Sequence, residues 1–401
     1  MKKMFFLYIM RLCFEGDLVK RDLMFLFLLI PISLFFYSCC FFGQKEYSDV
    51  EYRTLAQIPS LKYDDFINKK FQENFESAVA DQVMFSKNIK AIYINFFNNT
   101  NAYINNYLML LTNQKDDYTR ISENFYLYED GDYILDKKSI VNDYIQFEEV
   151  KDYYKNILSE VKIDQYLYYV TTDAVVNFVQ GDIMFYDWLV EAYRPTKSDY
   201  LKIKNYDDYK KYYYPTDHHW NHLGSYEGYK DIMKILLGDE ENILEPVREL
   251  IFDDIKFSGS RARTLATTKY SQKFGVYEFD IPEHEVYING ELKNNYREYE
   301  KYISGKYSTG IWDSHYELFY GRTYRELIFD FNQSEKENVL IISNSFGSAV
   351  QDLIASHFNK TYVIDKSNFE SGRNISEYIE ERNITKLILI GHINFFNKRF
   401  S

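Results

Sequence analysis

The chain has 401 residues, of which 46% are hydrophobic and 27% charged, enough apolar material for one large or two ordinary folded domains. Its formal net charge of −13 argues against nucleic-acid binding, because such proteins need an excess of Lys and Arg to neutralise phosphates. The 40 tyrosines and 32 phenylalanines suit carbohydrate rings, but they are spread along the chain, which favours a general compositional bias.

An uncharged apolar run occupies residues 23–42. A run of about 20 residues is long enough to cross the ~30 Å hydrocarbon core of a bilayer. Basic residues precede it, so we expect 1–22 to be a cytoplasmic leader and 23–42 a single-pass anchor in the cytoplasmic membrane. The bulk of the chain is then extracytoplasmic. A cleaved signal peptide is the alternative, although no small-residue cleavage site follows the run.

All three cysteines, Cys13, Cys39 and Cys40, lie in or before this apolar run. The rest of the chain therefore has no disulfide framework, no thiolate nucleophile and no zinc–thiolate site. It also has no glycine-rich phosphate loop. We expect a protein that works without a cofactor.

A polar stem is predicted at 43–61, followed by one folded domain at 62–401. Apolar residues at spacings of three and four predict a helix over Ile67–Ala78 and a further helix to about residue 106. Two aromatic runs around an Asp-Gly turn predict a hairpin at 125–135. An amphipathic helix (150–163) and a buried strand (164–172) follow.

The last 65 residues alternate strand and helix patterns. The apolar strands "NVLII", "TYVID" and "KLILIGH" are separated by the helices "SAVQDLIASHF" and "NISEYIEERN". Continuous apolar strands between helices predict a parallel sheet covered on both faces, hence the α/β class. Residues of about 240–335 have weak periodicity and predict an irregular insertion or a small β-region. Active groups of parallel sheets gather at the carboxyl ends of the strands.

A serine-rich turn, "SNSFG", follows the first of these strands. A hydroxyl there would stand at the carboxyl edge of the sheet, beside the first N–H groups of a helix, which can stabilise an oxyanion. Ser343 or Ser345 could equally serve as a helix cap, so this turn alone leaves both roles open.

The segment "TDHHWNH" holds three of the seven histidines. In an extended segment Asp217 and His219 point the same way, so the aspartate can orient the imidazole as a general base, while His218 faces away into packing. Trp220 would supply an apolar wall for substrate. Two alternatives remain open. One is a metal site formed by His218, His219 and His222 with Asp217, and the other is a buried polar cluster with a structural role.

The strings "YYPTDHHWNHLGSYEGYK" and "VLIISNSFGSAVQDLIASHFNKTYVID" resemble the DHHW family, which is related to the alginate O-acetyltransferase-like proteins of the SGNH-hydrolase superfamily. The resemblance covers roughly 46–401. It implies an SGNH-hydrolase-like parallel sheet flanked by helices. It also implies Ser345 as nucleophile, His219 as base and Asp217 as its orienter. Family members tend to have aspartate before the serine, where this chain has Asn344.

The same resemblance suggests oxyanion-hole candidates and a function. The candidates are Phe346, Gly321 and Asn394. The implied function is a membrane-anchored, extracytoplasmic O-acetyltransferase or acetylesterase acting on a cell-surface polysaccharide, with a membrane-bound O-acyltransferase as a candidate partner and acyl donor. No metal, cofactor or nucleic acid is expected. The alternative is a non-catalytic polysaccharide-binding or envelope-assembly protein that keeps the fold.

Overall fold

The structure is a computed structural model. It describes residues 46–48, 53–60, 63–68, 70–82 and 118–397, and in the last range it omits 123, 129–132, 137–139, 173–179, 239–242, 266–268, 294 and 366–373; before residue 118 it adds only isolated positions. The chain divides into two compact units, residues 1–93 and residues 94–401. The predicted anchor at 23–42 lies outside the described residues except for isolated positions. In the described part of the chain, no helix combines the length and apolarity needed to cross a membrane.

The first unit contains a short hairpin and two helices. Strand β1 (Tyr47–Ser48) pairs antiparallel with β2 (Arg53–Thr54), and helices α3 (Tyr63–Ile67) and α4 (Lys70–Gln82) follow. The Asp81 carboxylate accepts a hydrogen bond from the Ala56 N–H at 2.9 Å, which ties α4 to the segment after the hairpin. The helical prediction over Ile67–Ala78 is therefore correct except that the helix is divided in two. Most of the second predicted helix, to about residue 106, lies outside the described residues.

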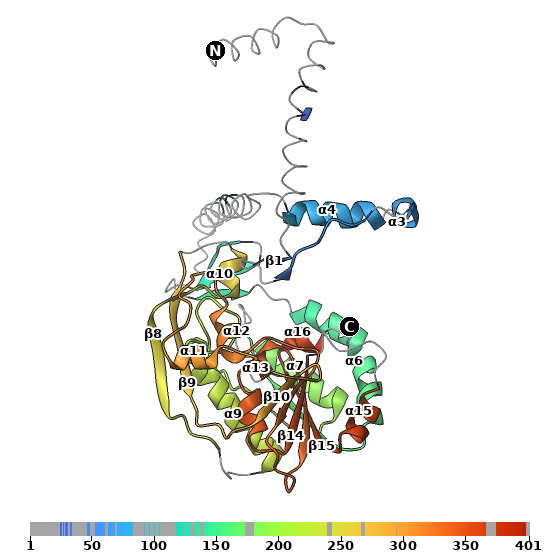
Figure 1. The fold of residues 1–401 in the computed structure, drawn as a ribbon, viewed down its shortest axis with the longest axis vertical. Coiled ribbons are helices and arrows are strands. Elements are labelled where there is room, and N and C mark those ends of the chain that lie inside the picture. Colours follow the sequence, from blue (N-terminus) through green and yellow to red (C-terminus); the bar gives the residue numbers. More distant parts are fainter. Residues whose placement is uncertain are drawn as a thin grey trace, which may run out of the picture. The chain divides into compact units, whose positions relative to one another are not determined.

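The second unit is built on an eight-stranded sheet of the described residues (Figure 1). In spatial order its strands are β11 (Glu291–Leu292), β10 (Glu285–Ile288), β12 (Leu327–Asp330), β14 (Lys360–Asp365), β13 (Asn338–Ser343), β15 (Ile384–Gly391), β6 (Asp164–Tyr169) and β7 (Lys197–Tyr200). From β14 to β7 all neighbours are parallel. The predicted parallel sheet is thus confirmed. At the other edge β12, β10 and β11 pair antiparallel.

Helices cover both faces of this sheet, as expected for continuous apolar strands. Along β13 the side chains of Val339 and Ile341 enter one core, and those of Leu340 and Ile342 enter the other. All four are fully buried. Successive residues of a strand point to opposite faces, so one apolar run supplies two cores.

The helices of the second unit complete these layers (Figure 1). The first core includes α9 (His222–Leu237) and α14 (Gln351–Ala355), and the second includes α6 (Ile140–Glu160), α7 (Gln180–Tyr193) and α15 (Ile375–Glu381). The remaining helices are short: α8 (Tyr206–Tyr212), α10 (Ser260–Thr264), α11 (Tyr299–Ile303), α12 (His315–Tyr320), α13 (Ser345–Ser348) and α16 (Ile393–Phe396).

In the described part of the second unit, two small antiparallel sheets lie outside the central one. One contains β3 (Tyr118–Arg120), β4 (Phe125–Tyr128) and β5 (Ile134–Asp136), which confirms the hairpin predicted at 125–135. The other pairs β8 (Arg248–Phe257) with β9 (Gln272–Glu278). The stretch of about 240–335 is therefore more ordered than an irregular insertion, because it also supplies β10, β11 and β12 to the central sheet.

The helix predicted after "SNSFG", at 348–358, differs from the structure. Helical backbone begins earlier, at Ser345 within the predicted turn, and is interrupted between α13 and α14, where Val350 has φ −127° and ψ −10°. The Val350 N–H bonds the Gly347 carbonyl at 3.0 Å, a three-residue spacing typical of a tight helical turn. By contrast, the predicted Asn374 cap of α15 is confirmed, since its side chain accepts from the Ser376 N–H at 2.8 Å.

Candidate functional site

Ser345 begins α13 directly after the central strand β13. Asn344 caps this helix, because its side-chain oxygen accepts a hydrogen bond from the Phe346 N–H at 3.2 Å. The turn is tight enough that a Cβ on Gly347 would lie 2.5 Å from the Cβ of Ser343, so only glycine fits. The local sequence therefore presents the Ser345 hydroxyl at the carboxyl edge of the parallel strands.

The structure brings together the three residues that the sequence named as a triad. His219 Nε2 lies 2.8 Å from Ser345 Oγ, and His219 Nδ1 lies 2.8 Å from Asp217 Oδ1. Asp217 and His219 are buried, at 1% and 6% exposure. A carboxylate can only accept, so Nδ1 carries the proton and Nε2 is free to accept the Ser345 hydroxyl proton. This is the arrangement that activates a serine nucleophile.

Burial and charge set the pKa values of this pair. Burial alone would raise the pKa of Asp217, but the positive charge of His219 and hydrogen bonds from His218 and His219 hold it well below its usual range. Burial, and next the charge of His218, lowers the pKa of His219 to about 4. At neutral pH Asp217 is therefore ionised and His219 is a neutral base.

The loop that carries this pair is fixed from both ends. Tyr213 and Trp220 form an isolated antiparallel bridge across the turn. Asn221 then caps α9, since its side chain accepts from the Leu223 N–H at 2.9 Å and the Gly224 N–H at 3.0 Å. This confirms the predicted cap, and the helix ends as expected at Gly238, which adopts φ +90°.

The prediction that Trp220 forms a wall for substrate is wrong. Its side chain is fully buried and lies over Gly228 of α9, where a Cβ would come within 2.6 Å of the indole ring. Its N–H donates to the Tyr316 hydroxyl at 3.2 Å. A fully buried ring supports the loop but cannot touch a substrate.

Tyr316 of α12 is a site residue that the sequence did not reveal. Its ring stacks on the His219 imidazole, with ring centroids 3.9 Å apart and planes 11° apart. Its hydroxyl donates to the Ser345 carbonyl at 3.2 Å. Tyr316 thus positions both the proposed base and the serine backbone. It lies in the weakly periodic stretch, where no sequence signal distinguished it from the other tyrosines.

A second missed element is the start of α10, which lies against Asp217. The Ser260 N–H donates to Asp217 Oδ2 at 3.1 Å, and Ser260 Oγ donates to Asp217 Oδ1 at 2.9 Å. A Cβ on Gly259 would come within 2.6 Å of the Asp217 Cα, so the close approach requires glycine. Arg261 Nη1 donates to the Asp217 carbonyl at 3.0 Å. The available signal was the run of small residues in "FSGSR".

His218 does not face away into packing, contrary to the prediction. Its ring centroid lies 3.8 Å from that of His219, its Nδ1 lies 2.6 Å from Ser260 Oγ, and its side chain is 35% exposed. The prediction assumed an extended segment with alternating side chains. Residues 215–219 instead form turns and bends, in which neighbouring side chains can point the same way.

The oxyanion-hole candidates have different outcomes. The Phe346 N–H already donates to the Asn344 side chain, and the Gly321 N–H closes α12 by bonding the Glu317 carbonyl at 2.9 Å, so neither group is available as it stands. Asn394 is exposed on α16 and stays a prediction. Among the residues that the structure describes, the Ser345 N–H has no hydrogen-bond acceptor, so it is a further candidate donor.

His392 is a further neighbour of the site. It directly follows β15, the strand beside β13, and its ring centroid lies 4.9 Å from that of Phe346. Its Nδ1 lies 3.0 Å from the side-chain nitrogen of Asn344. The asparagine therefore both caps α13 and orients an imidazole, two tasks that suit an uncharged amide. A histidine at the end of a predicted parallel strand was the signal that could have found it.

The metal alternative loses one of its ligands. His222 points elsewhere, with Nε2 2.7 Å from Glu249 Oε1. Asp217, His218 and His219 do each offer a ligand atom within 4.8 Å of the others. However, both imidazole Nδ1 atoms face the same carboxylate oxygen, at 3.2 and 2.8 Å, which is the geometry of hydrogen bonds.

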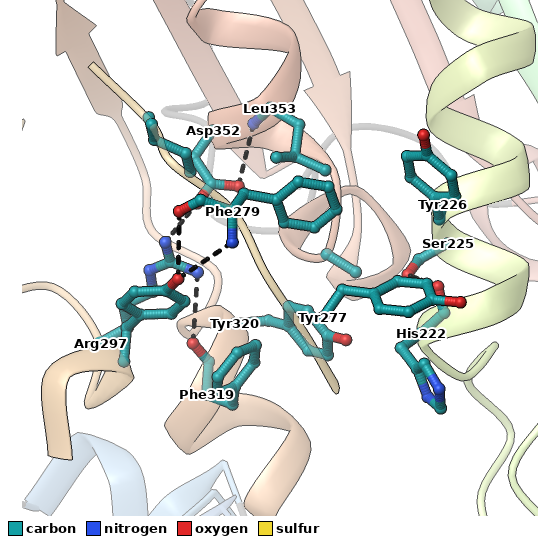
Figure 2. A pocket seen from close by; sticks show the side chains of 13 residues that line it. His222, Ser225, Tyr226, Tyr277, Phe279, Arg297, Phe319, Tyr320, Asp352 and Leu353 are labelled. Atoms are coloured by element: carbon teal, nitrogen blue, oxygen red, sulfur yellow. Dashed lines mark hydrogen bonds and ion pairs between the residues drawn. The ribbon is translucent and has the colours of Figure 1, made fainter. Parts of the chain in front are cut away.

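A small pocket is lined by residues of α9, α12 and α14. Figure 2 shows the Arg297 guanidinium facing the Asp352 carboxylate there, and the two form an ion pair. The cavity has a volume of about 20 Å³, room for about one water molecule. It is too small for a substrate, so we assign it a structural role.

Comparisons with known proteins give similarities to solved structures. The chain is similar to PatB1 from Bacillus cereus with a sulfonyl adduct (14% identity, TM-score 0.49, covering 69% of this chain and 97% of that one). It is also similar to a DHHW family protein from Eubacterium siraeum (13% identity, TM-score 0.49, covering 71% and 94%). A third match is the O-acetyltransferase domain of Pseudomonas putida AlgJ (9% identity, TM-score 0.36, covering 70% and 91%).

These matches include a DHHW family protein and an O-acetyltransferase domain, the kinds of protein that the sequence resemblance names. No protein-family model matches the chain, and no curated protein matches it in sequence. The identities are low and the TM-scores lie below 0.5.

Proposed function

We propose that the protein is a serine-dependent O-acetyltransferase or carbohydrate acetylesterase. The observation that carries this proposal is the unbroken line of hydrogen bonds from Ser345 Oγ through His219 to Asp217, each 2.8 Å long. Hydrogen-bond contact between nucleophile and base, with a third group orienting the base, is the requirement for acyl transfer through a serine.

The reaction would proceed in two halves. Ser345 Oγ attacks the acetyl carbonyl while His219 Nε2 takes its proton and passes it to the departing alcohol. Water or a sugar hydroxyl then attacks acetyl-Ser345, gives its proton to His219, and Ser345 Oγ recovers that proton as its bond to the acetyl group breaks. The Ser345 N–H is our candidate donor to the oxyanion in both halves.

The proposal of a carbohydrate substrate is supported by a groove beside α12. Its volume is about 690 Å³, within the usual range of ligand pockets of roughly 300–1,000 Å³. Three tyrosines and several charged side chains line it, among them Tyr299, Tyr324, Glu317 and Arg322. Glu317 directly follows Tyr316, so α12 both lines the groove and supports the His219 imidazole. Aromatic faces with hydrogen-bonding neighbours suit sugar rings.

The apolar run at 23–42 and its basic leader support a membrane-anchored, extracytoplasmic enzyme that acts on a cell-surface polysaccharide. A membrane-bound O-acyltransferase is our candidate acyl donor, on the basis of the family resemblance. The alternative is a polysaccharide-binding protein without activity. It would not explain why Ser345, His219 and Asp217 are aligned by hydrogen bonds.

The test is turnover of p-nitrophenyl acetate by the full-length protein in detergent. We expect Ser345→Ala to lose at least roughly 10³-fold in kcat, since the nucleophile is removed. Ser343→Ala is the matched control, because Ser343 is the other serine of the turn and makes no contact with His219 in the described residues. Equal activity of Ser345→Ala and wild type would refute the assignment, and an inactive wild type would favour the binding protein.

A further inference from the structure

Two histidines, not one, are oriented by the Asp217 carboxylate. His219 Nδ1 lies 2.8 Å and His218 Nδ1 lies 3.2 Å from the same oxygen, Oδ1. The rings lie side by side, with centroids 3.8 Å apart and planes 37° apart. The proposed reaction uses only the imidazole of His219, so the orientation of the second ring needs its own explanation.

The hydrogen bonds determine which nitrogen of His218 carries a proton. Ser260 Oγ has one proton, and it donates that proton to Asp217 Oδ1 at 2.9 Å. Toward His218 Nδ1, 2.6 Å away, Ser260 Oγ can therefore only accept. Nδ1 thus faces two acceptors, the Ser260 hydroxyl oxygen and the carboxylate, and must itself be protonated. In the neutral ring this leaves Nε2 with its lone pair.

His218 and His219 therefore present the same chemistry. In both rings Nδ1–H is directed to Asp217 and Nε2 is a hydrogen-bond acceptor. His219 Nε2 faces Ser345, whereas His218 Nε2 has no hydrogen-bond partner among the described residues, and the His218 side chain is 35% exposed. His218 also lies beside Phe346, the residue after the serine, at 5.8 Å between ring centroids. A second acceptor thus stands at the open side of the site.

We propose that His218 is a specificity residue that binds the acceptor through a second hydroxyl group. One hydroxyl of a vicinal diol on a sugar ring would give its proton to His219 as it attacks acetyl-Ser345. The neighbouring hydroxyl would donate a hydrogen bond to His218 Nε2. The inference rests on the proposed acetyl transfer and names its acceptor as a 1,2-diol. It also gives a sugar an advantage over water, which cannot bridge the two rings in the same way.

The experiment measures how the acetyl group is divided between acceptors. Full-length protein would be incubated with p-nitrophenyl acetate as acetyl donor. The acceptor would be either trans-cyclohexane-1,2-diol or cyclohexanol, which differ by one hydroxyl. The readout is the ratio of acetylated alcohol to free acetate, which does not depend on the amount of active enzyme. One added neutral hydrogen bond contributes about 1 kcal/mol, so we expect roughly fivefold more transfer to each hydroxyl of the diol than to cyclohexanol.

Two variants test the role of His218. His218→Phe keeps a ring beside His219 but removes Nε2, and we expect the preference for the diol to vanish. Ser260→Ala leaves both imidazoles in place, removes one of the two acceptors that orient His218 Nδ1, and should lower the preference. An equal ratio for the two alcohols in wild type, or an unchanged preference in both variants, would overturn the inference. An inactive wild type would instead overturn the proposed function.

Discussion

Replacing Tyr316 with phenylalanine tests the link between α12, the loop and the serine. The change removes one hydroxyl and keeps the ring that stacks on His219. That hydroxyl accepts from the Trp220 N–H at 3.2 Å and donates to the Ser345 carbonyl at 3.2 Å. Tyr316 is 1% exposed and Trp220 is fully buried, so water cannot replace the lost partner.

The cost follows from the buried groups left unpaired. A buried donor without an acceptor costs ~1–3 kcal/mol, so we expect Tyr316→Phe to lower the free energy of unfolding by about 2 kcal/mol. With a urea m-value of ~2 kcal/mol per M, the unfolding midpoint would fall by about 1 M. The kcat for p-nitrophenyl acetate should fall about tenfold, because the Ser345 carbonyl loses its hydrogen bond from Tyr316 while the His219 imidazole keeps its stacking partner.

Urea unfolding followed by circular dichroism, together with p-nitrophenyl acetate turnover, measures both effects. Tyr287→Phe is the control, since the Tyr287 hydroxyl donates to Glu285 at an exposed position. The free energy of unfolding of this variant should differ from wild type by less than about 0.5 kcal/mol. If Tyr316→Phe unfolds at the wild-type urea concentration, the Tyr316 hydroxyl does not hold Trp220 and Ser345 as described.

Four further predictions address the site and its support. Because burial lowers the pKa of His219 to about 4, the base stays neutral above that pH, so kcat/KM for the ester should fall only as pH drops through about 4; a half-loss near pH 6.5 would contradict this. Asp217→Asn should lower kcat by roughly 10³–10⁴-fold, since an amide allows the wrong tautomer of His219, and activity within tenfold of wild type would show that the carboxylate is dispensable. Asp352→Ala should lower the free energy of unfolding by about 3–5 kcal/mol, because Arg297 would keep an uncompensated buried charge; a change below about 1 kcal/mol in urea unfolding would argue against a buried pair. Dialysis against EDTA should leave ester turnover unchanged, and a loss restored by a divalent cation would revive the metal alternative.

The parallel core of the fold was predictable because its strands are read from short, continuous apolar runs. The strand "NVLII" corresponds to β13, and its residues are buried on both faces. The serine turn and the Asp217–His219 pair could be named from local sequence, since the serines follow a predicted strand and the aspartate stands two residues before the histidine. These signals are local and need no knowledge of distant contacts. The choice of Ser345 over Ser343 came from the family resemblance, and the structure places its Oγ 2.8 Å from His219 Nε2.

The parts that sequence could not supply depend on contacts between distant segments. Ser260 meets Asp217 across 43 residues, and Tyr316 reaches Ser345 across 29 residues, from a stretch without clear periodicity. The direction of His218 depends on a turn where the prediction assumed extended backbone. The burial of Trp220 depends on the glycine at position 228, whose missing side chain makes room for the indole.

The stretch at 240–335 has a consequence for anyone who wishes to shorten this protein. A truncated version that kept the parallel strands and the Asp217 loop would still contain every residue of the proposed triad. It would lack Ser260, which holds the carboxylate, and Tyr316, which supports the imidazole. Such a shortened protein would keep the proposed triad but lose the contacts that align it, so residues 240–335 are part of the proposed site's support.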